Sequence, residues 1–435
     1  MKRYEEYKDS EIAGIIQIPV SWSSVKLKFV ASCNDDVLAD STEDGEIISY
    51  VEIGDVDYVN GITNATEYEF GEAPSRARRI TRPDDIIVST VRTYLKAIAK
   101  IPTTNLIVST GFAVIRPQYI NKNFMCYALL APPFIEEVMS RSVGVSYPAI
   151  KASLLMDIKI CVPQLQEQQS IASFLDAKTK PIDNIISKRE KQIELLEEMK
   201  SAIISHAVTK GLNPDAKMKD SGIEWIGEIP ESWEIGKLKY GLKGMQDGTH
   251  GSYTSIESEY PLLSAKNVTE KGITVSDGER YISKNDYDSI ISNGYPQKND
   301  IVLCCVGTIG RCCIYKLDHS IAFQRSVTFL RTNSILNTEY LLFSLRSTVF
   351  LPQYELYSKT TAQSGIYMGA LANMITILPP REEQGQIASY LDSETSKLDT
   401  RIAKRRRQIE LLQEYKQALI TDAVTGKIDV RGFNS

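Results

Sequence analysis

The sequence predicts a mixed α+β protein with a pseudo-twofold internal duplication, in which two globular blocks are joined by two long helices. The first observation is a repeat: residues 163–210 and 379–426 align at a constant offset of 216. The second is a shorter repeat before each copy, residues 8–22 and 219–233. The third is that the blocks between the repeats diverge. Solenoid repeats run to about 50 residues, so this long period indicates duplication of one module.

Composition sets the class of protein. The 435 residues suggest several domains at about 150 residues each. Apolar residues make up 43% and charged residues 24%, with a net charge of −5, which excludes disorder and a whole-chain basic nucleic-acid binder. Seven cysteines do not form a disulfide framework, and no window is apolar enough to span a membrane. We therefore expect a reduced, cytoplasmic protein without membrane spans.

The repeated blocks have helical periodicity. A short helix over 167–178 or 383–395 should precede a longer one, and Pro181 suits the first turn of a helix over 181–208. Two such helices most simply pack on each other, and basic seam positions would fix their register. The apolar seam residues are Ile186, Ile193, Leu196, Ile203 and Ala207, copied as Ile402, Ile409, Leu412, Leu419 and Ala423, and the basic ones are Arg189, Lys200, Arg405 and Lys416.

Each helix also has a second apolar set. A two-helix coil would expose this set, and exposed apolar stripes usually mark a binding surface. Packing against the chain's own globular blocks is the alternative. The set comprises Ile185, Leu195, Met199, Ile204 and Val208 in the first copy, and Leu411, Tyr415, Ile420 and Val424 in the second.

The divergent blocks have mixed patterns, and each is long enough to bury a core. Expected strands are 86–91, 106–115, 301–306 and 312–315, and expected helices are 123–140 and 338–350.

No catalytic motif is complete. Ala131-Pro132-Pro133-Phe134 resembles an amino-methyltransferase motif, but Ala131 lacks the polar acceptor, so a turn that breaks the helix is the simpler interpretation. The adjacent cysteines at 304–305 and 312–313 point to opposite strand faces and suit core packing rather than zinc. Pro83-Asp84 with Asp157-Ile158-Lys159 is too common a pattern to indicate a nuclease. We expect no catalytic residue and no metal site.

Charge is unevenly placed in the first block. Residues 31–72 contain twelve acidic side chains and no basic one, whereas residues 76–116 carry a net charge of +6. A basic stretch usually forms a solvated face, but such segregation also predicts phosphate contacts.

The motifs together resemble the specificity subunit of type I restriction–modification systems. The resemblance rests on KDSGIEWIGEIPESW at 219–233 with its copy at 8–22, and on the proline-then-Glu-Gln segments that begin at 163 and 379. DGTHGSY at 247–253 and NDIVLCCVGTIGR at 299–311 also look like the family's target-recognition domains. The likeness covers essentially the whole chain. In this chain Gly14 stands where Trp225 stands in the second copy, and Lys397 replaces Pro181, which puts exact symmetry in doubt.

The resemblance implies a non-catalytic DNA-binding subunit. Each target-recognition domain would read one half of a split DNA sequence, and the helices would form an antiparallel coiled coil that sets the gap. Two methylation subunits would add adenine-N6 methylation with S-adenosylmethionine, and restriction subunits would add ATP- and Mg-dependent cleavage; this chain itself would need no cofactor. The implied domains are 1–162, a helical region 163–212, 213–378, a second helical region 379–427 and a tail 428–435.

A helix over 181–208 would span about 42 Å at about 1.5 Å per residue, comparable to the roughly 34–36 Å of one DNA turn. The rival hypothesis is a helical dimerisation or adaptor protein without DNA binding. The DNA target cannot be predicted, since no code relates divergent loops to bases. The expected DNA-binding residues are Arg76, Arg78, Arg79, Arg92, Lys96, Ser146, Tyr147, His250, Lys266, Arg311, Ser364 and Tyr367, and the expected subunit-docking residues are Leu195, Met199, Ile204, Leu411, Tyr415 and Ile420.

Overall fold

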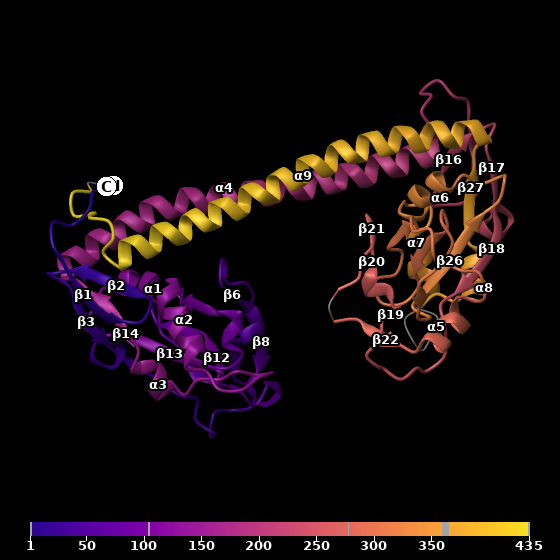
Figure 1. The fold of residues 1–435 in the computed structure, drawn as a ribbon. Coiled ribbons are helices and arrows are strands. Elements are labelled where there is room, and N and C mark those ends of the chain that lie inside the picture. The colour runs from indigo at the N-terminus through magenta and orange to yellow at the C-terminus, as the bar shows by residue number, and fades with distance from the viewer. Residues whose placement is uncertain (1, 103–104, 277, 359–364, 434–435) are drawn as a thin grey trace. The chain divides into compact units, whose positions relative to one another are not determined.

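The computed structural model describes residues 2–102, 105–276, 278–358 and 365–433. The chain divides into two compact units (Figure 1): unit 1 comprises Met1–Glu190 with Arg406–Ser435, and unit 2 comprises Lys191–Arg405. Each unit therefore contains one globular domain and one half of each long helix. Among the described residues, no helix combines the length and the apolar character that a membrane span needs.

The two long helices are α4 (Leu165–Lys210) and α9 (Arg381–Val424). The expected division of each block into a short and a long helix is wrong, because each block forms one continuous helix. Pro181 lies inside α4, where it removes one backbone hydrogen bond. Buried Leu175 and Ile182 flank it, so packing on both sides of the proline holds the helix together. At about 1.5 Å per residue, α4 spans about 69 Å.

The helices pair antiparallel, and each unit contains one copy of the same ion pair. In unit 1, Lys416 Nζ lies 2.6 Å from Asp183; in unit 2, Lys200 Nζ lies 2.8 Å from Asp399. Lys416 and Asp399 stand at the offset of 216 from Lys200 and Asp183, so the two pairs are repeat equivalents. Both lysines are more than four-fifths buried. Two of the four predicted basic seam residues, Lys200 and Lys416, therefore have acidic partners on the opposite helix. The seam residues Ile186, Ile402 and Leu419 are buried as expected.

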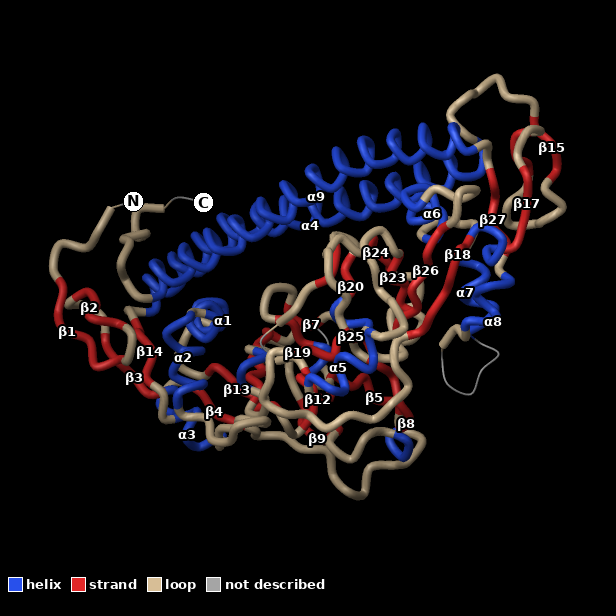
Figure 2. The backbone as a smooth tube through the Cα atoms, turned by 45° about the vertical axis from the view of Figure 1, so that its right-hand side comes forward, coloured by secondary structure: helices blue, strands red, loops and turns tan. Residues whose placement is uncertain are grey.

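The first globular domain contains two four-stranded sheets, ordered β11-β10-β13-β4 and β8-β5-β12-β9, whose strands are drawn in red in Figure 2. Its strands are β1 (Tyr7–Ile12), β2 (Ile15–Pro19), β3 (Ser23–Lys26), β4 (Ala31–Cys33), β5 (Ile47–Val51), β6 (Val56–Asp57), β7 (Gly61–Ile62), β8 (Thr66–Glu69), β9 (Ala77–Ile80), β10 (Ile86–Ser89), β11 (Ile98–Lys100), β12 (Ile107–Ser109), β13 (Phe112–Pro117) and β14 (Lys159–Val162). Its helices are α1 (Lys122–Leu130), α2 (Pro132–Ser140) and α3 (Ala152–Met156).

Two local predictions in this domain have clear outcomes. The expected helix over 123–140 breaks at Ala131, because Pro132 begins α2 at a position that needs no backbone N–H; the helix-breaking interpretation is confirmed. The single strand expected over 106–115 is wrong. A turn at Gly111 separates β12 from β13, which join different sheets, and a Cβ at Gly111 would lie 2.7 Å from Ile53.

The second domain repeats this plan with sheets ordered β18-β26-β23-β24 and β22-β19-β25. Its strands are β15 (Met218–Asp220), β16 (Glu228–Pro230), β17 (Glu234–Lys237), β18 (Leu242–Asp247), β19 (Tyr260–Leu263), β20 (Val268–Thr269), β21 (Gly272–Ile273), β22 (Arg280–Ile282), β23 (Ile301–Cys304), β24 (Cys312–Ile314), β25 (Ala322–Phe323), β26 (Val327–Thr332) and β27 (Ile375–Leu378). Its helices are α5 (Lys284–Ile291), α6 (Thr338–Leu345), α7 (Leu351–Ser358) and α8 (Met368–Asn373).

The cysteines of the second domain lie in its core, as predicted. β23 and β24 pair antiparallel, and all four thiols of the hairpin are buried. Burial raises the pKa of the Cys305 thiol to about 12, so this thiol stays protonated. Among the described residues, no group of three or more His, Cys, Asp or Glu is placed to hold a metal ion.

Equivalent polar contacts fix each long helix to its domain. Gln168 and Gln384 each accept a hydrogen bond of 2.7 Å from the backbone N–H of a helix-capping asparagine, Asn121 or Asn337. The same amides donate to the carbonyls of Pro163 and Pro379. The proline-then-Glu-Gln segment is therefore a joint between helix and domain.

The C-terminal tail belongs to the first domain. After α9, Gly426 adopts φ +74°, and a Cβ there would lie 2.4 Å from Pro19. The tail then donates from Asp429 N–H to the carbonyl of Lys2 and packs Phe433 against Phe174. The two chain ends thus complete one core.

Candidate nucleic-acid interface

The basic stretch of the first domain does not form one free cationic face. Arg78 and Arg79 follow each other on β9 and so point to opposite faces of the sheet. The Arg78 guanidinium lies over Phe70, 4.7 Å from the ring centroid, while Arg79 Nε is buried without a hydrogen-bond partner. Arg76 is exposed. These three arginines are therefore not gathered at one point.

The acidic and basic stretches neutralise each other in space. Arg116 makes a two-bond pair with buried Asp85 and also contacts Asp35 and Asp36. Arg82 binds Asp36 at 2.9 Å. The net charge of +6 counted along 76–116 therefore overstates the field around the domain. Of the basic side chains in residues 76–116, a smaller set is therefore exposed and able to contact phosphate.

Arg92 and Lys96 belong to that set and flank a single 3-10 turn over Thr93–Leu95. Both residues have left-handed backbones, with φ of 52° and 53°. Such conformations are uncommon for residues other than glycine and cluster at functional sites. Both side chains are exposed, so this turn projects two cations from the edge of the domain.

A loop over 142–149 lies beside this turn and is fixed at its base. Val143 and Ala149 exchange two backbone hydrogen bonds, and the Thr93 hydroxyl lies 2.9 Å from Ser142 Oγ. The Arg92 guanidinium stands 5.2 Å from the ring centroid of Tyr147. The structure thus brings the predicted residues Arg92, Lys96, Ser146 and Tyr147 to one edge, which we call the turn–loop edge (residues 92–96 and 142–149).

The turn–loop edge also exposes apolar side chains that were not predicted as site residues. Val145 is fully exposed, and Val143 and Tyr147 are 79% and 66% exposed. Tyr94 and Leu95 are about half exposed. The signal was present in the sequence as apolar residues around Gly144 in an otherwise polar loop. Guanidinium, ammonium, aromatic and apolar groups together suit phosphate contact and base-edge contact.

The second domain repeats the base of this edge. Val306 pairs with Gly365 as Val91 pairs with Ala149. Ile366 N–H donates to the carbonyl of Cys305, as Ile150 N–H donates to Thr90. Tyr367 is exposed at this place. The predicted residue Ser364 lies outside the described residues.

The other predicted residues of the second domain differ in their exposure and partners, although Arg311 contacts the residue directly before Lys266. His250 is exposed, with Nε2 3.7 Å from Asp247. Lys266 binds Glu279 at 2.8 Å. Burial favours a higher pKa for the Glu279 carboxyl. Hydrogen bonds from Lys266, Ser276 and Asn267 outweigh burial and lower this pKa to about 2. Arg311 is half-buried and donates to the carbonyl of Ala265 at 2.7 Å. DNA contacts by these residues stay predictions.

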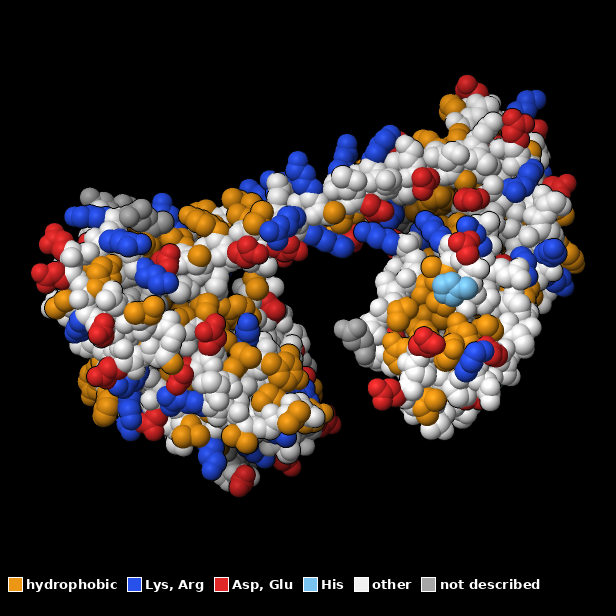
Figure 3. All heavy atoms as spheres, viewed as in Figure 1, with side chains coloured by type: hydrophobic (Ala, Val, Ile, Leu, Met, Phe, Trp, Pro, Cys, Tyr) orange, Lys and Arg blue, Asp and Glu red, His pale blue; other side chains and the backbone are white. Residues whose placement is uncertain are grey.

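The second apolar set of the helices is only partly exposed. Leu195, Met199, Leu411 and Tyr415 are each about half exposed, and hydrophobic side chains interrupt the charged surface of the helices in Figure 3. The expectation that Ile204 and Ile420 are exposed is wrong. They are 4% and 3% exposed and lie in the cores of the second and first domains, because the ends of the helices pack against the domains. The same holds for Val208 and Val424.

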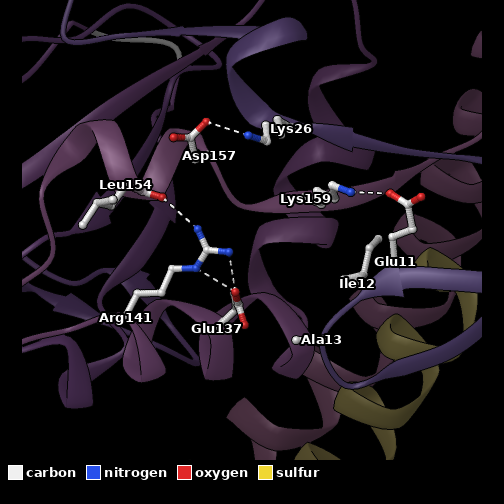
Figure 4. Close-up of a pocket in the computed structure, with 9 residues that line it drawn as sticks. All are labelled: Glu11, Ile12, Ala13, Lys26, Glu137, Arg141, Leu154, Asp157 and Lys159. Carbon is white, nitrogen blue, oxygen red and sulfur yellow. Dashed lines mark hydrogen bonds and ion pairs between the residues drawn. The ribbon is translucent and has the colours of Figure 1, made fainter.

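A polar cavity of about 310 Å³ lies in the first domain (Figure 4). Its charges are paired: Arg141 with Glu137, Lys26 with Asp157, and Lys159 with Glu11. Asp157 binds Lys26 and Lys28, whereas Asp84 binds Lys100 and Lys122. The two carboxylates of the nuclease-like pattern therefore have separate sets of partners and do not form one site.

The comparisons with known proteins agree on one family. The model for the type I restriction modification DNA specificity domain matches residues 19–195 and 257–411. The chain is 30% identical over 309 residues to the type I restriction enzyme MjaVIII specificity subunit of Methanocaldococcus jannaschii, covering 68% of each chain. It is 23% identical over 440 residues to the EcoBI specificity subunit of Escherichia coli, covering 98% of this chain and 90% of that one.

A solved structure supports the fold. The work that reports it is described as "Structural basis underlying complex assembly and conformational transition of the type I R-M system". The chain matches it with a TM-score of 0.66 and 22% identity, covering 94% of this chain and 99% of that chain. At this identity, the likeness concerns the fold.

Proposed function

This chain belongs to the family of type I restriction–modification specificity subunits, which recognise DNA targets, and from that premise we propose that it reads a bipartite target with one half-site per domain. The observation that carries the proposal is the duplicated frame. Val91 with Ala149 and Val306 with Gly365 form equivalent bridges in the two domains, while the segments they hold differ in sequence. A fixed frame with different displayed side chains suits two readers of different half-sites.

The turn–loop edge is the proposed reader of the first domain. Arginine makes two-bond contacts to guanine, and apolar side chains contact the thymine methyl group. Arg92 and Val145 provide these two kinds of group on one edge, and Lys96 adds a phosphate contact. In the second domain, the segment around Val306 and Tyr367 holds the equivalent place.

The paired helices are the proposed spacer and docking surface. Leu195 and Met199 on α4, and their equivalents Leu411 and Tyr415 on α9, are half-exposed apolar residues on otherwise charged helices. Two equivalent patches suit two identical methylation subunits. Methylation with S-adenosylmethionine, and ATP- and Mg-dependent cleavage, would then belong to the methylation and restriction subunits, and this chain would be non-catalytic.

Two measurements test this function. Gel shifts with a DNA library, run with and without the methylation subunits, should recover duplexes that share a split motif. Maps of N6-methyladenine in cells that express the subunits with and without this chain should show the same motif. Absence of chain-dependent binding and methylation would instead favour an adaptor without DNA binding.

A further inference from the structure

Each domain packs on the long helices through a shared apolar core and several polar contacts, and one further contact lies away from the Gln168 and Gln384 joints. In the first domain this contact is made by the β6–β7 hairpin, and in the second by the β20–β21 hairpin (Figure 1). The hairpins occupy equivalent positions in the duplicated fold, and each turn begins with a polar residue, Tyr58 or Glu270. The rest of the two turns differs in sequence.

In unit 1, the Tyr58 hydroxyl bridges a short helix and a long one. Its oxygen lies 2.9 Å from the carbonyl oxygen of Leu130, at the end of α1, and 2.5 Å from Oε1 of Gln417 on α9. Gln417 Nε2 also donates to the Leu130 carbonyl at 3.1 Å. Burial raises the pKa of Tyr58 to about 12, so the hydroxyl keeps the proton it donates.

In unit 2, an ion pair takes the place of the hydroxyl. Glu270 Oε2 lies 3.3 Å from Lys200 Nζ on α4, the same ammonium that binds Asp399 on α9. Arg346, just after α6, donates to the Glu270 carbonyl at 3.2 Å. The hairpin is thus tied to the helix pair and to its own domain, with different chemistry from Tyr58.

The first hairpin also touches the turn–loop edge. The Lys96 ammonium stands 5.7 Å from the Tyr58 ring centroid, and β11, which follows Lys96, lies against β6 and β7. A tilt of the domain on the helices would therefore move the edge and break the Tyr58 contact together. The Tyr58 contact adds to the core packing and to the Tyr127 contact with α4 in resisting that tilt.

We propose that Tyr58 and Glu270 are positioning residues that fix the angle of each domain on the helices, and thereby the number of base pairs between the half-sites. This inference rests on the proposed bipartite reading. It predicts that loss of an anchor leaves the half-site bases unchanged and relaxes the gap, because the reading side chains are untouched while their spacing becomes variable.

The test is to map N6-methyladenine in DNA methylated by the complete complex. The wild-type complex is mapped first, to define the motif and the gap. In Tyr58→Phe, methylation at sites with one base pair more or fewer, relative to the native gap, should rise roughly 3- to 10-fold, as loss of one hydrogen bond allows. Glu270→Gln should raise it about two- to threefold, because that pair is partly exposed. Tyr119→Phe is the matched control, since Tyr119 is 79% exposed in the same domain.

Gln417→Leu removes the same anchor from the helix side and tests the idea independently if Tyr58→Phe folds poorly. Hydrogen exchange of residues 56–62 should accelerate in both variants and not in the control. If wild type methylates a split motif and the variants methylate sites with altered gaps no more than the control does, the proposed anchoring role of Tyr58 is wrong. A wild-type motif that is not split would overturn the proposed function, and the anchor with it.

Discussion

The two recognition domains share their internal contacts and differ at their edges. Asp85 with Arg116 and Asp300 with Arg331 form the same two-bond pair, and Gln168 and Gln384 make the same helix joint. At the edge, Arg92 of the first domain corresponds to Gly307 of the second, which has no side chain and therefore no charge. The contacts that stabilise the fold thus recur in both domains, whereas the exposed side chains at the edge differ. This difference suits a protein in which each domain can change its half of the DNA target separately.

The buried ion pairs offer the largest test of the shared frame. Breaking a buried pair by removing one partner costs about 3–5 kcal/mol, and Asp300→Ala should lower the free energy of unfolding of the second domain by this amount. Asp85→Ala should cost less, because Arg116 keeps Asp35 and Asp36. Among the described residues, Asp300 is the carboxylate within 4 Å of Arg331. Hydrogen exchange against urea would measure each domain separately, and a larger loss for Asp85→Ala would contradict the assignment.

Substitutions in the helix patches test whether the two proposed docking sites exist and are equivalent. Leu195→Glu with Met199→Glu should weaken one site by about 1.5–3 kcal/mol, since full burial of one apolar side chain contributes about that much and each of the two is already about half buried. Light scattering of the assembled complex should then find one methylation subunit in place of two. Leu411→Glu with Tyr415→Glu should do the same at the other site. Retention of two subunits, or unfolding of the isolated variants, would count against the patches.

Arg92 tests the edge of the first domain alone. Arg92→Ala should weaken specific binding by about 1–3 kcal/mol and relax one half-site if Arg92 reads a base. If it contacts only phosphate, binding should fall on all sequences and the salt slope should shrink by about one. Gel shifts at several salt concentrations separate these results. Unchanged binding in Arg92→Ala and Lys96→Ala would remove the turn–loop edge as a reader.

The seam lysines should show the smallest effect, with a larger cost at Lys200, which also binds Glu270, than at Lys416. Lys416→Met removes its ion pair with Asp183, and Lys200→Met removes two pairs, with Asp399 and with Glu270; the acidic partners are about half exposed or more, so each pair should cost about 1 kcal/mol or less. Hydrogen exchange along α4 and α9 would report the local loss. A cost of several kcal/mol at one lysine only would show that the two halves of the coil are not equivalent.

Local patterns in the sequence predicted the repeated parts of the fold well. The offset of 216 located both helices, the Pro132-Pro133 pair located the break after Leu130, and the adjacent cysteines were correctly placed in the core. Comparison of the two copies suffices for the helices, and short-range rules suffice for the break and the cysteines because the residues that decide them are neighbours along the chain.

Long-range contacts were not predictable in the same way. Asp35 and Asp36 fold onto Arg116, which the charge count along the chain cannot reveal. Helix α4 continues past Pro181 because residues on both sides of the proline are packed. Ile204 and Ile420 are buried in the domain cores. The turn–loop edge was predicted in part, and the apolar residues around Gly144 could have indicated Val145, whereas the Tyr58 contacts join segments that are distant in the sequence.

Each domain is proposed to read its own half-site. Exchange of residues 20–160 for the equivalent block of a relative, followed by N6-methyladenine mapping of the assembled methylation complex, tests it most directly. We predict that one half of the methylated motif changes completely while the other half is retained. A change in both halves, or in neither, would contradict the claim.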